Sequence, residues 1–305
     1  MQIVRVESLN YSYRERQALR DVSFSVERGE IFGLLGPNGG GKSTTFRILS
    51  TFLKPAAGAV TMFSMDAAAS AGEIRKKIGV VFQSGSLDRK LTVFENLLHQ
   101  GHLYGLRGET LKRRIQDLLS RFGIADRSRE SIERLSGGMR RRVEIAKGIL
   151  HHPELLVLDE PSTGLDPAVR LELWNYLDQL RATDQVTVLL TTHFMEEAER
   201  CDRLAILDRG QVVALGTPVK MKQEVGGEVL DIRSHTAENL AAAVRKEFGI
   251  EVRSLNGSLR IESANAHELV PKLVEKFGNE IDSVTLGRPT LEDVFIHHTG
   301  HRMEE

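Results

Sequence analysis

The stretch EIFGLLGPNGGGKST, residues 30–44, decides the fold of this chain. Residues 30–36 are typical of a buried strand, and residues 42–53 are typical of a helix that is closed by Lys54-Pro55. Between them, residues 36–43 contain the pattern G-x-x-x-x-G-K-S in full. A glycine turn with a chance lysine would match less well, because strand, loop and helix are all in place. The stretch therefore predicts a phosphate-binding loop.

Each residue type in this loop has a chemical reason. Glycines let backbone N–H groups turn toward phosphate oxygens, and the N-terminus of the following helix adds a positive partial charge. Lys42 can reach the outer phosphates, and the Ser43 hydroxyl can ligate Mg²⁺. The predicted nucleotide-binding residues of the loop are Gly36, Pro37, Asn38, Gly39, Gly40, Gly41, Lys42, Ser43 and Thr44.

The rest of the first two-thirds alternates between strand-like and helix-like segments. Buried β-branched runs recur at 155–160, 186–193 and 203–216, and alternating strands are expected at 3–9 and 22–30. Residues 92–135 have helical periodicity and many charges, so we expect a helical insertion there. This pattern predicts an α/β core with a largely parallel sheet.

Polar residues at the ends of these strands are candidates for the same site. Asp159 and Glu160 end an apolar run, so Asp159 can hold Mg²⁺ and Glu160 can polarise an attacking water. Gln83 and His193 each follow a buried strand, although a lone histidine there is more often structural. Tyr13 is either ordinary packing or an aromatic platform for adenine.

A second glycine pair occurs in LSGGMRRR, residues 135–142. Taken locally, it is an anion site at a helix N-terminus, followed by arginines that could contact nucleic acid. The formal net charge of the whole chain is only -1, which gives no general attraction to nucleic acid. The arginines therefore fit better as residues of the helix itself.

Residues after Pro218 follow a different pattern. Strands are expected at 228–234, 250–255, 258–263 and 281–287, with helices at 237–249 and 264–278. Asn256-Gly257 is a strong hairpin signal, and Pro271 marks either a first turn or a kink. The order βαββαβ predicts a small α+β domain of the ferredoxin-like kind, followed by a short helix at 290–298.

Composition limits the class of protein. The chain has 305 residues, enough for roughly two domains of about 150 residues each. Its one cysteine, Cys201, rules out an internal disulfide, and we expect it to be a small packing residue. No apolar run reaches about 18 residues, so any membrane-spanning part is expected on another chain.

Together these motifs resemble the ATP-binding cassette of ABC transporters, a P-loop NTPase with a RecA-like core and a helical subdomain. The resemblance covers residues 1–218, with the helical subdomain at about 84–145, and leaves 219–305 as an accessory or regulatory domain. It implies that Tyr13 stacks on adenine, that Ser43, Gln83 and Asp159 serve Mg²⁺, and that Glu160 and His193 are catalytic. It further implies that Asp166 lies in the D-loop and that Ser136, Gly137 and Gly138 bind the ATP held by a second subunit.

The segment RPTLEDVFIHHTG, residues 288–300, resembles the daunorubicin-resistance branch, which serves type-2 ABC exporters. This resemblance implies an ATPase that uses ATP and Mg²⁺, forms a homodimer or heterodimer, and binds an integral-membrane permease at the cytoplasmic face of the cell membrane. It implies export of a drug, lipid or polysaccharide and no nucleic-acid partner.

Two alternatives stay open. One is a cassette ATPase that acts on nucleic acid or the ribosome; such proteins carry a long coiled-coil insertion or two cassettes, and this chain has one cassette and a short insertion. The other is a subunit that binds ATP without turnover, against which Glu160 and His193 argue. A neighbouring gene for a polytopic membrane protein would favour the exporter.

Overall fold

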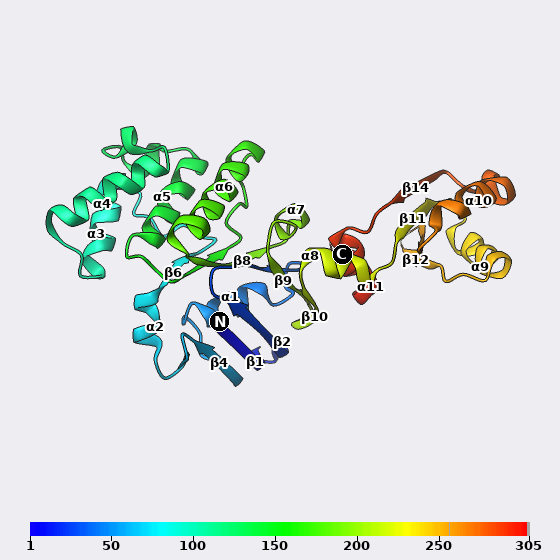
Figure 1. Ribbon diagram of the computed structural model, residues 1–305, viewed down its shortest axis with the longest axis horizontal. Helices are drawn as coiled ribbons and strands as arrows, with labels where there is room; N and C mark the ends of the chain where they lie inside the picture. The colour runs from blue at the N-terminus through cyan, green and yellow to red at the C-terminus, as the bar shows by residue number, and fades with distance from the viewer. Residues whose placement is uncertain (256, 304–305) are drawn as a thin grey trace. The chain divides into compact units, whose positions relative to one another are not determined.

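The computed structural model describes residues 1–255 and 257–303 and divides into two compact units, Met1–Val212 and Val213–Glu305 (Figure 1). Asn256, half of the predicted hairpin turn, lies outside the described residues. No described helix combines the length and the apolar character that crossing a bilayer requires.

A six-stranded sheet forms the centre of the first unit, in the order β10-β9-β3-β8-β7-β6. The pairs of β3 with β8 and β9, and of β7 with β6 and β8, are parallel, which confirms the predicted α/β core. Every residue of β3, β7 and β8 is buried, as expected for strands covered on both faces. The strands are β3 Ile31–Leu35, β6 Ile78–Val81, β7 Leu155–Asp159, β8 Thr187–Thr192, β9 Arg203–Asp208 and β10 Gln211–Gly216.

The first unit also contains an antiparallel sheet in the order β2-β1-β4-β5. Both predicted strands are present. β1 Gln2–Tyr13 runs past the predicted end at residue 9, and β2 Arg16–Glu27 begins before residue 22 but ends at Glu27, so the predicted end at residue 30 was wrong. Strands β4 Ala57–Met62 and β5 Met65–Asp66 were not predicted. In β4 only Val60 and Met62 are buried, and the sequence AGAVTM shows little alternation of apolar and polar residues. The strand forms because it pairs with β1, which the local sequence does not reveal.

Helix α1 spans Lys42–Leu49, so the prediction that it continues to Leu53 was wrong. Thr51 takes a left-handed conformation with φ 59, which ends the helix. The backbone N–H groups of Phe52 and Leu53 then both donate to Arg47 O.

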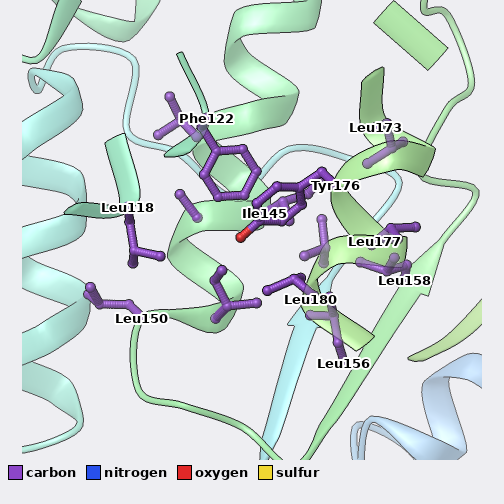
Figure 2. Packing of buried hydrophobic residues seen from close by; sticks show 14 of the residues in the cluster. Leu118, Phe122, Ile145, Leu150, Leu156, Leu158, Leu173, Tyr176, Leu177 and Leu180 are labelled. Atoms are coloured by element: carbon purple, nitrogen blue, oxygen red, sulfur yellow. The ribbon is translucent and has the colours of Figure 1, made fainter. Parts of the chain in front are cut away.

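The predicted helical insertion is confirmed. Between β6 and β7, where every residue is described, the chain forms no β-strand. Its helices there are α3 Val93–Leu103, α4 Gly108–Arg121 and α5 Gly137–Ile149. Figure 2 shows apolar side chains of this insertion meeting those of α6 Pro167–Asp184 and of β7 in one core. The rings of Phe122 and Tyr176 lie 3.9 Å apart at their centroids. The two remaining helices of this unit are α2 Ala71–Lys77 and α7 Met195–Ala198.

Cys201 has the packing role that was predicted. Its side chain is buried, and a Cβ placed on Gly33 would lie 2.8 Å from Cys201 Sγ. The thiol therefore fills space next to β3.

The second unit has the predicted βαββαβ order, with an antiparallel sheet arranged β12-β13-β11-β14. Pro271 lies in the first turn of α10, which resolves the choice between a first turn and a kink. The unit has a hydrophobic core of its own. Its elements are α8 Pro218–Glu224, β11 Glu228–Arg233, α9 Ala237–Phe248, β12 Arg253–Leu255, β13 Ser258–Ser263, α10 Leu269–Phe277, β14 Ser283–Gly287 and α11 Leu291–Thr299.

A buried arginine joins α11 to this sheet. Arg260 on β13 is 2% exposed and lies 2.5 Å from Asp293 on α11. It also donates to Glu262 at 2.9 Å. Asp231 on β11 is a third carboxylate, 3.9 Å from the Arg260 guanidinium, and this buried charge cluster fixes where the last helix docks.

Candidate functional site

The phosphate loop connects β3 to α1 and depends on its glycines. Gly39 and Gly41 have φ values of 81 and 109, a region that other residues rarely adopt. A Cβ on Gly36 would lie 2.2 Å from Leu207 O, and one on Gly41 would lie 2.8 Å from Leu19 Cδ2. The loop therefore holds its open shape only with glycine at these positions.

Lys42 lies across this loop. Its Nζ donates to Gly36 O at 2.7 Å and to Pro37 O at 3.0 Å, and lies 3.6 Å from Glu160 Oε1. Burial lowers the pKa of this ammonium, while the nearby Glu160 carboxylate acts in the opposite direction. A buried cation that is held mainly by carbonyl oxygens is suited to take a further anionic partner such as phosphate.

A cavity of about 410 Å³ opens beside the loop, which is room for part of a nucleotide. Tyr13 lies at its edge with 38% exposure, and Arg47 donates to its hydroxyl at 3.4 Å. Arg16 and Arg47 were missed by sequence reasoning. Arg47 could have been found from its position one turn into α1. The lining residues are Tyr13, Arg16, Ala18, Pro37, Asn38, Gly39, Gly41, Lys42, Ser43, Thr44, Arg47 and Glu160.

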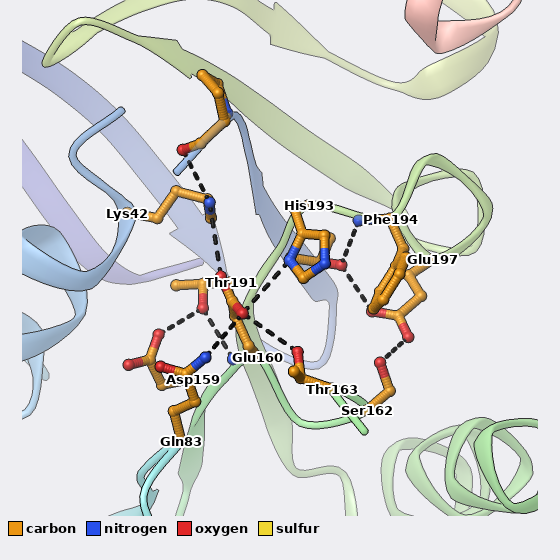
Figure 3. A network of polar contacts seen from close by, with 12 residues as sticks. Lys42, Gln83, Asp159, Glu160, Ser162, Thr163, Thr191, His193, Phe194 and Glu197 are labelled. Atoms are coloured by element: carbon orange, nitrogen blue, oxygen red, sulfur yellow. Dashed lines mark hydrogen bonds and ion pairs between the residues drawn. The ribbon is translucent and has the colours of Figure 1, made fainter. Parts of the chain in front are cut away.

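Glu160, directly after β7, is the centre of the polar network in Figure 3. Gln83 Nε2 donates to its Oε2 at 3.0 Å, Thr163 Oγ1 donates at 3.1 Å, and His193 Nδ1 lies 3.3 Å away. The Glu160 side chain is 8% exposed, and its backbone has φ 42. The structure thus brings Lys42, Gln83, Glu160 and His193 together from four separate segments.

Thr191 on β8 orients both acidic residues. Its hydroxyl donates to Asp159 Oδ1 at 2.7 Å and accepts the Glu160 N–H at 2.9 Å. Burial raises the pKa of Asp159, and the hydrogen bond from Thr191 partly offsets that effect. Sequence reasoning missed Thr191, whose role follows from its position opposite Asp159 in the parallel register.

Glu197 on α7 was also missed. Its buried carboxylate accepts hydrogen bonds from Ser162 and, at 2.7 Å, from Thr192 (Figure 3). The Thr192 hydroxyl in turn accepts the Phe194 N–H at 2.9 Å. This network fixes the backbone on both sides of His193, and the pair Glu196-Glu197 gave no sequence signal because adjacent acids usually face solvent.

The second glycine pair begins α5. Ser136 is the N-cap residue and accepts the Met139 N–H at 3.2 Å. A Cβ on Gly138 would lie 2.9 Å from Val169 Cγ1, so this glycine is needed where α5 and α6 approach closely. None of Ser136, Gly137 and Gly138 lines the cavity beside Lys42, and Ser136 and Gly137 are exposed.

Two of the three arginines that follow make contacts within the chain. Arg142 donates to Phe122 O at 3.1 Å and pairs with Glu172, and Arg141 donates to Phe82 O at 2.8 Å. Asp166 is the exposed residue that precedes α6, and its side chain makes no capping bond.

The oxygen set available for Mg²⁺ is small. It comprises the Ser43 hydroxyl, the Asp159 carboxylate and the Gln83 amide oxygen, and the described residues contain no cluster of three or more His, Cys, Asp or Glu that could hold a metal. Mg²⁺ in phosphate sites commonly takes one or two protein oxygens and completes its shell with water and phosphate. The residues present therefore fit that ion.

A strand, a glycine loop with a buried lysine, and two carboxylates at the end of an adjacent strand define a P-loop nucleotide hydrolase. The family model described as "ABC transporter" matches residues 19–163. The chain belongs to the family of ABC transporter ATP-binding subunits, in the branch of the daunorubicin-resistance proteins. As a member of this family the chain is an ATPase, and proteins of the family couple ATP hydrolysis to transport.

Three relatives cover nearly the full length. The chain is 38% identical to the daunorubicin resistance ATP-binding protein DrrA3 of Streptomyces coeruleorubidus, over 97% of this chain and 96% of that protein. It is 39% identical to the Nod factor export ATP-binding protein I of Rhizobium sp. (strain N33), over 96% of both. It is 33% identical to the linearmycin resistance ATP-binding protein LnrL of Bacillus subtilis (strain 168), over 99% and 100%.

Solved structures agree on the fold. An ATP-binding subunit of an ABC transporter superposes with a TM-score of 0.66 and 32% identity, over 73% of this chain and 92% of that one. A dimeric ATP-binding cassette with ADP and Pi, in a post-hydrolysis state, gives a TM-score of 0.64 and 28% identity, over 70% and 98%.

Proposed function

We propose that this chain powers the export of a substrate of the drug, lipid or polysaccharide class through a separate integral-membrane permease. The names of its full-length relatives state drug resistance or Nod factor export, which supports the exporter branch. On this proposal the protein is peripheral on the cytoplasmic face of the cell membrane. Residues 1–218 are the ATP-binding cassette and residues 219–305 an accessory or regulatory domain.

The contacts of Glu160 carry the proposed chemistry. Glu160 accepts a proton from the attacking water, and His193, 3.3 Å away, orients that carboxylate and meets the γ-phosphate. Lys42 and the loop amides bind the outer phosphates, while Tyr13 stacks on adenine. Mg²⁺ would be held by Ser43, Gln83 and Asp159, and when bound it would neutralise negative charge on the phosphates.

Each complete site on this proposal is built from two chains, in a homodimer or a heterodimer. Ser136, Gly137 and Gly138 would bind the γ-phosphate of the ATP held by the partner, and Asp166 would lie at the contact between subunits. Ser136 and Gly137 are exposed and do not line the cavity beside Lys42, which supports this arrangement. ATP then joins the two cassettes, and its hydrolysis weakens the dimer.

The substitution Glu160→Gln tests the assignment of the general base. We expect the ATPase rate to fall about 10²- to 10⁴-fold, the range typical of general-base removal, while ATP still binds. The matched control is Glu109→Gln, because Glu109 is an exposed carboxylate on α4 that forms a surface ion pair with Lys112. Turnover of Glu160→Gln close to that of the wild type would overturn the assignment.

A further inference from the structure

One face of α5 carries charged side chains that all reach the same loop. Arg141, Glu144 and Lys147 are three residues apart, so they project from neighbouring turns of the helix. Each contacts residues 82–87, the segment that contains Gln83. Side chains of α5 therefore join this helix to both ends of the loop that carries Gln83.

Glu144 holds the part of the loop after Gln83. Its carboxylate is 5% exposed and accepts the backbone N–H groups of Ser86 and, at 3.0 Å, Leu87. The Ser86 hydroxyl donates to the same carboxylate at 2.7 Å, and Lys147 Nζ donates to Ser86 O at 2.8 Å. A buried carboxylate with three donors is a strong attachment point for a loop.

Arg141 holds the part before Gln83 and also the backbone around Glu160. Its guanidinium donates to Phe82 O at 2.8 Å, to Pro161 O at 2.7 Å and to Asp159 O at 3.2 Å. The residues directly before Gln83 and on both sides of Glu160 therefore share one donor group.

We propose that Arg141 and Glu144 are positioning residues that hold the Gln83 loop and the backbone on both sides of Glu160 against the start of α5. This inference rests on the proposed roles of Gln83, Glu160 and Ser136. With both residues in place, the 3.0 Å hydrogen bond between Gln83 and Glu160 keeps its geometry, and Ser136 at the start of the same helix is held at a fixed position relative to them. The alternative is that they only stabilise the fold.

The substitution Glu144→Gln tests the proposal, because one amide oxygen cannot replace two carboxylate oxygens as the acceptor of three donors. We expect faster hydrogen exchange at the amides of Ser86 and Leu87. We also expect kcat for ATP to fall on the order of tenfold with KM little changed, since a misplaced catalytic group loses rate while the phosphate loop is untouched. Glu144→Asp, which keeps both oxygens, should recover part of kcat, and Glu109→Gln should match the wild type.

Three results would overturn the proposal. They are unchanged exchange at Ser86 and Leu87, an unchanged kcat despite faster exchange, and a loss of kcat that only follows a lower melting temperature. Should Glu144→Gln not fold, Ser86→Ala removes only the hydroxyl contacts with Glu144 and Lys147 and should give a smaller effect in the same direction. Full activity of Glu160→Gln would instead refute the proposed role of Glu160. Hydrogen exchange at Ser86 and Leu87 does not depend on that role, so the two failures can be told apart.

Discussion

Asp159 and Glu160 are adjacent in sequence, yet the fold gives them different surroundings. Asp159 accepts the Thr191 hydroxyl, and burial raises its pKa. Glu160 instead contacts Lys42, Gln83 and His193. Two neighbouring carboxylates with different environments are suited to different tasks, and those proposed for them are metal binding and proton transfer.

We predict that Asp159→Asn makes the nucleotide-free protein more stable and the ATPase slower. The raised pKa means that the folded state binds the Asp159 proton more tightly than the unfolded chain does. The stability that proton binding contributes is fully present below the ordinary pKa of 3.8 and is lost as the pH rises through the higher pKa of the folded state. At pH 7 the ionised carboxylate thus destabilises the fold, and asparagine removes that charge.

The expected melting temperature of Asp159→Asn at pH 7 is on the order of 2 °C above that of the wild type, with the difference shrinking toward pH 4. Calorimetry without nucleotide measures this, and an ATPase assay should show a strong loss. A variant that is less stable than the wild type at pH 7 would contradict the prediction.

At the residue scale, the sequence indicated which motif residues would lie together but not the residues that hydrogen-bond to them. Lys42, Gln83, Glu160 and His193 follow buried strands or a loop of known chemistry, so their convergence could be expected. Thr191 and Glu197 could not, because their roles depend on strand register and on which side chains face each other. Such pairings are set by tertiary packing rather than by local pattern.

Elements with strong periodicity were predictable and marginal ones were not. The insertion at 92–135 was recognised as helical because its helices bury one face, for example Leu111, Ile115 and Leu118 on α4. Strand β4 and the end of α1 were not recognised correctly. The first depends on pairing with β1, and the second on the left-handed conformation of Thr51.

His151, just after α5, supplies an element-scale prediction about pH. Its Nε2 lies 2.9 Å from Ile78 O, and its ring stacks on Tyr104 with centroids 3.7 Å apart. Burial lowers the pKa of His151 from 6.5 to about 4. The folded state thus favours neutral imidazole, and the stability this gives is present above pH 6.5 and is lost as the pH falls through about 4.

We expect His151→Phe to unfold with a shallower dependence on pH between 6.5 and 4. Phenylalanine keeps a ring against Tyr104 and takes up no proton, so the drop in unfolding free energy over this range should shrink by about 2 kcal/mol, allowing for partial solvent screening. Losing the contact with Ile78 O should cost about 1 kcal/mol at every pH. Urea unfolding at pH 7 and pH 4.5 measures both effects, with His102→Gln on the exposed side of α3 as control. Parallel curves for His151→Phe and the wild type would rule out the assignment.

For the whole molecule, sequence predicted two compact parts because each has its own periodic pattern. The second unit closes its own core around Leu230, Leu240 and Leu259, and its βαββαβ order was visible in the spacing of strands and helices. A ferredoxin-like fold does not determine a function, so sequence and fold together leave the task of residues 219–305 as a proposal.

The proposed composite site belongs to the scale of the whole molecule, and two defective variants test it. Lys42→Ala removes the lysine proposed to bind phosphate, and Ser136→Arg places a bulky cation where the partner's phosphate would bind. In a background of Glu160→Gln, which slows hydrolysis, neither variant alone should dimerise with ATP. Ser136→Arg should nevertheless still bind ATP, since it does not line the cavity beside Lys42.

Mixing the two variants should restore ATP-dependent association. In a mixed dimer, one site takes Lys42 from the Ser136→Arg chain and Ser136 from the Lys42→Ala chain, so it is intact, while the other site carries both changes. Because a two-fold dimer offers two equivalent sites, about half of the ATP-binding capacity of the mixed dimer should remain. Size-exclusion chromatography with differently tagged chains would detect the mixed species. If each cassette completed its own site, Ser136→Arg alone would impair the chain that carries it, and no mixture with Lys42→Ala could rescue association.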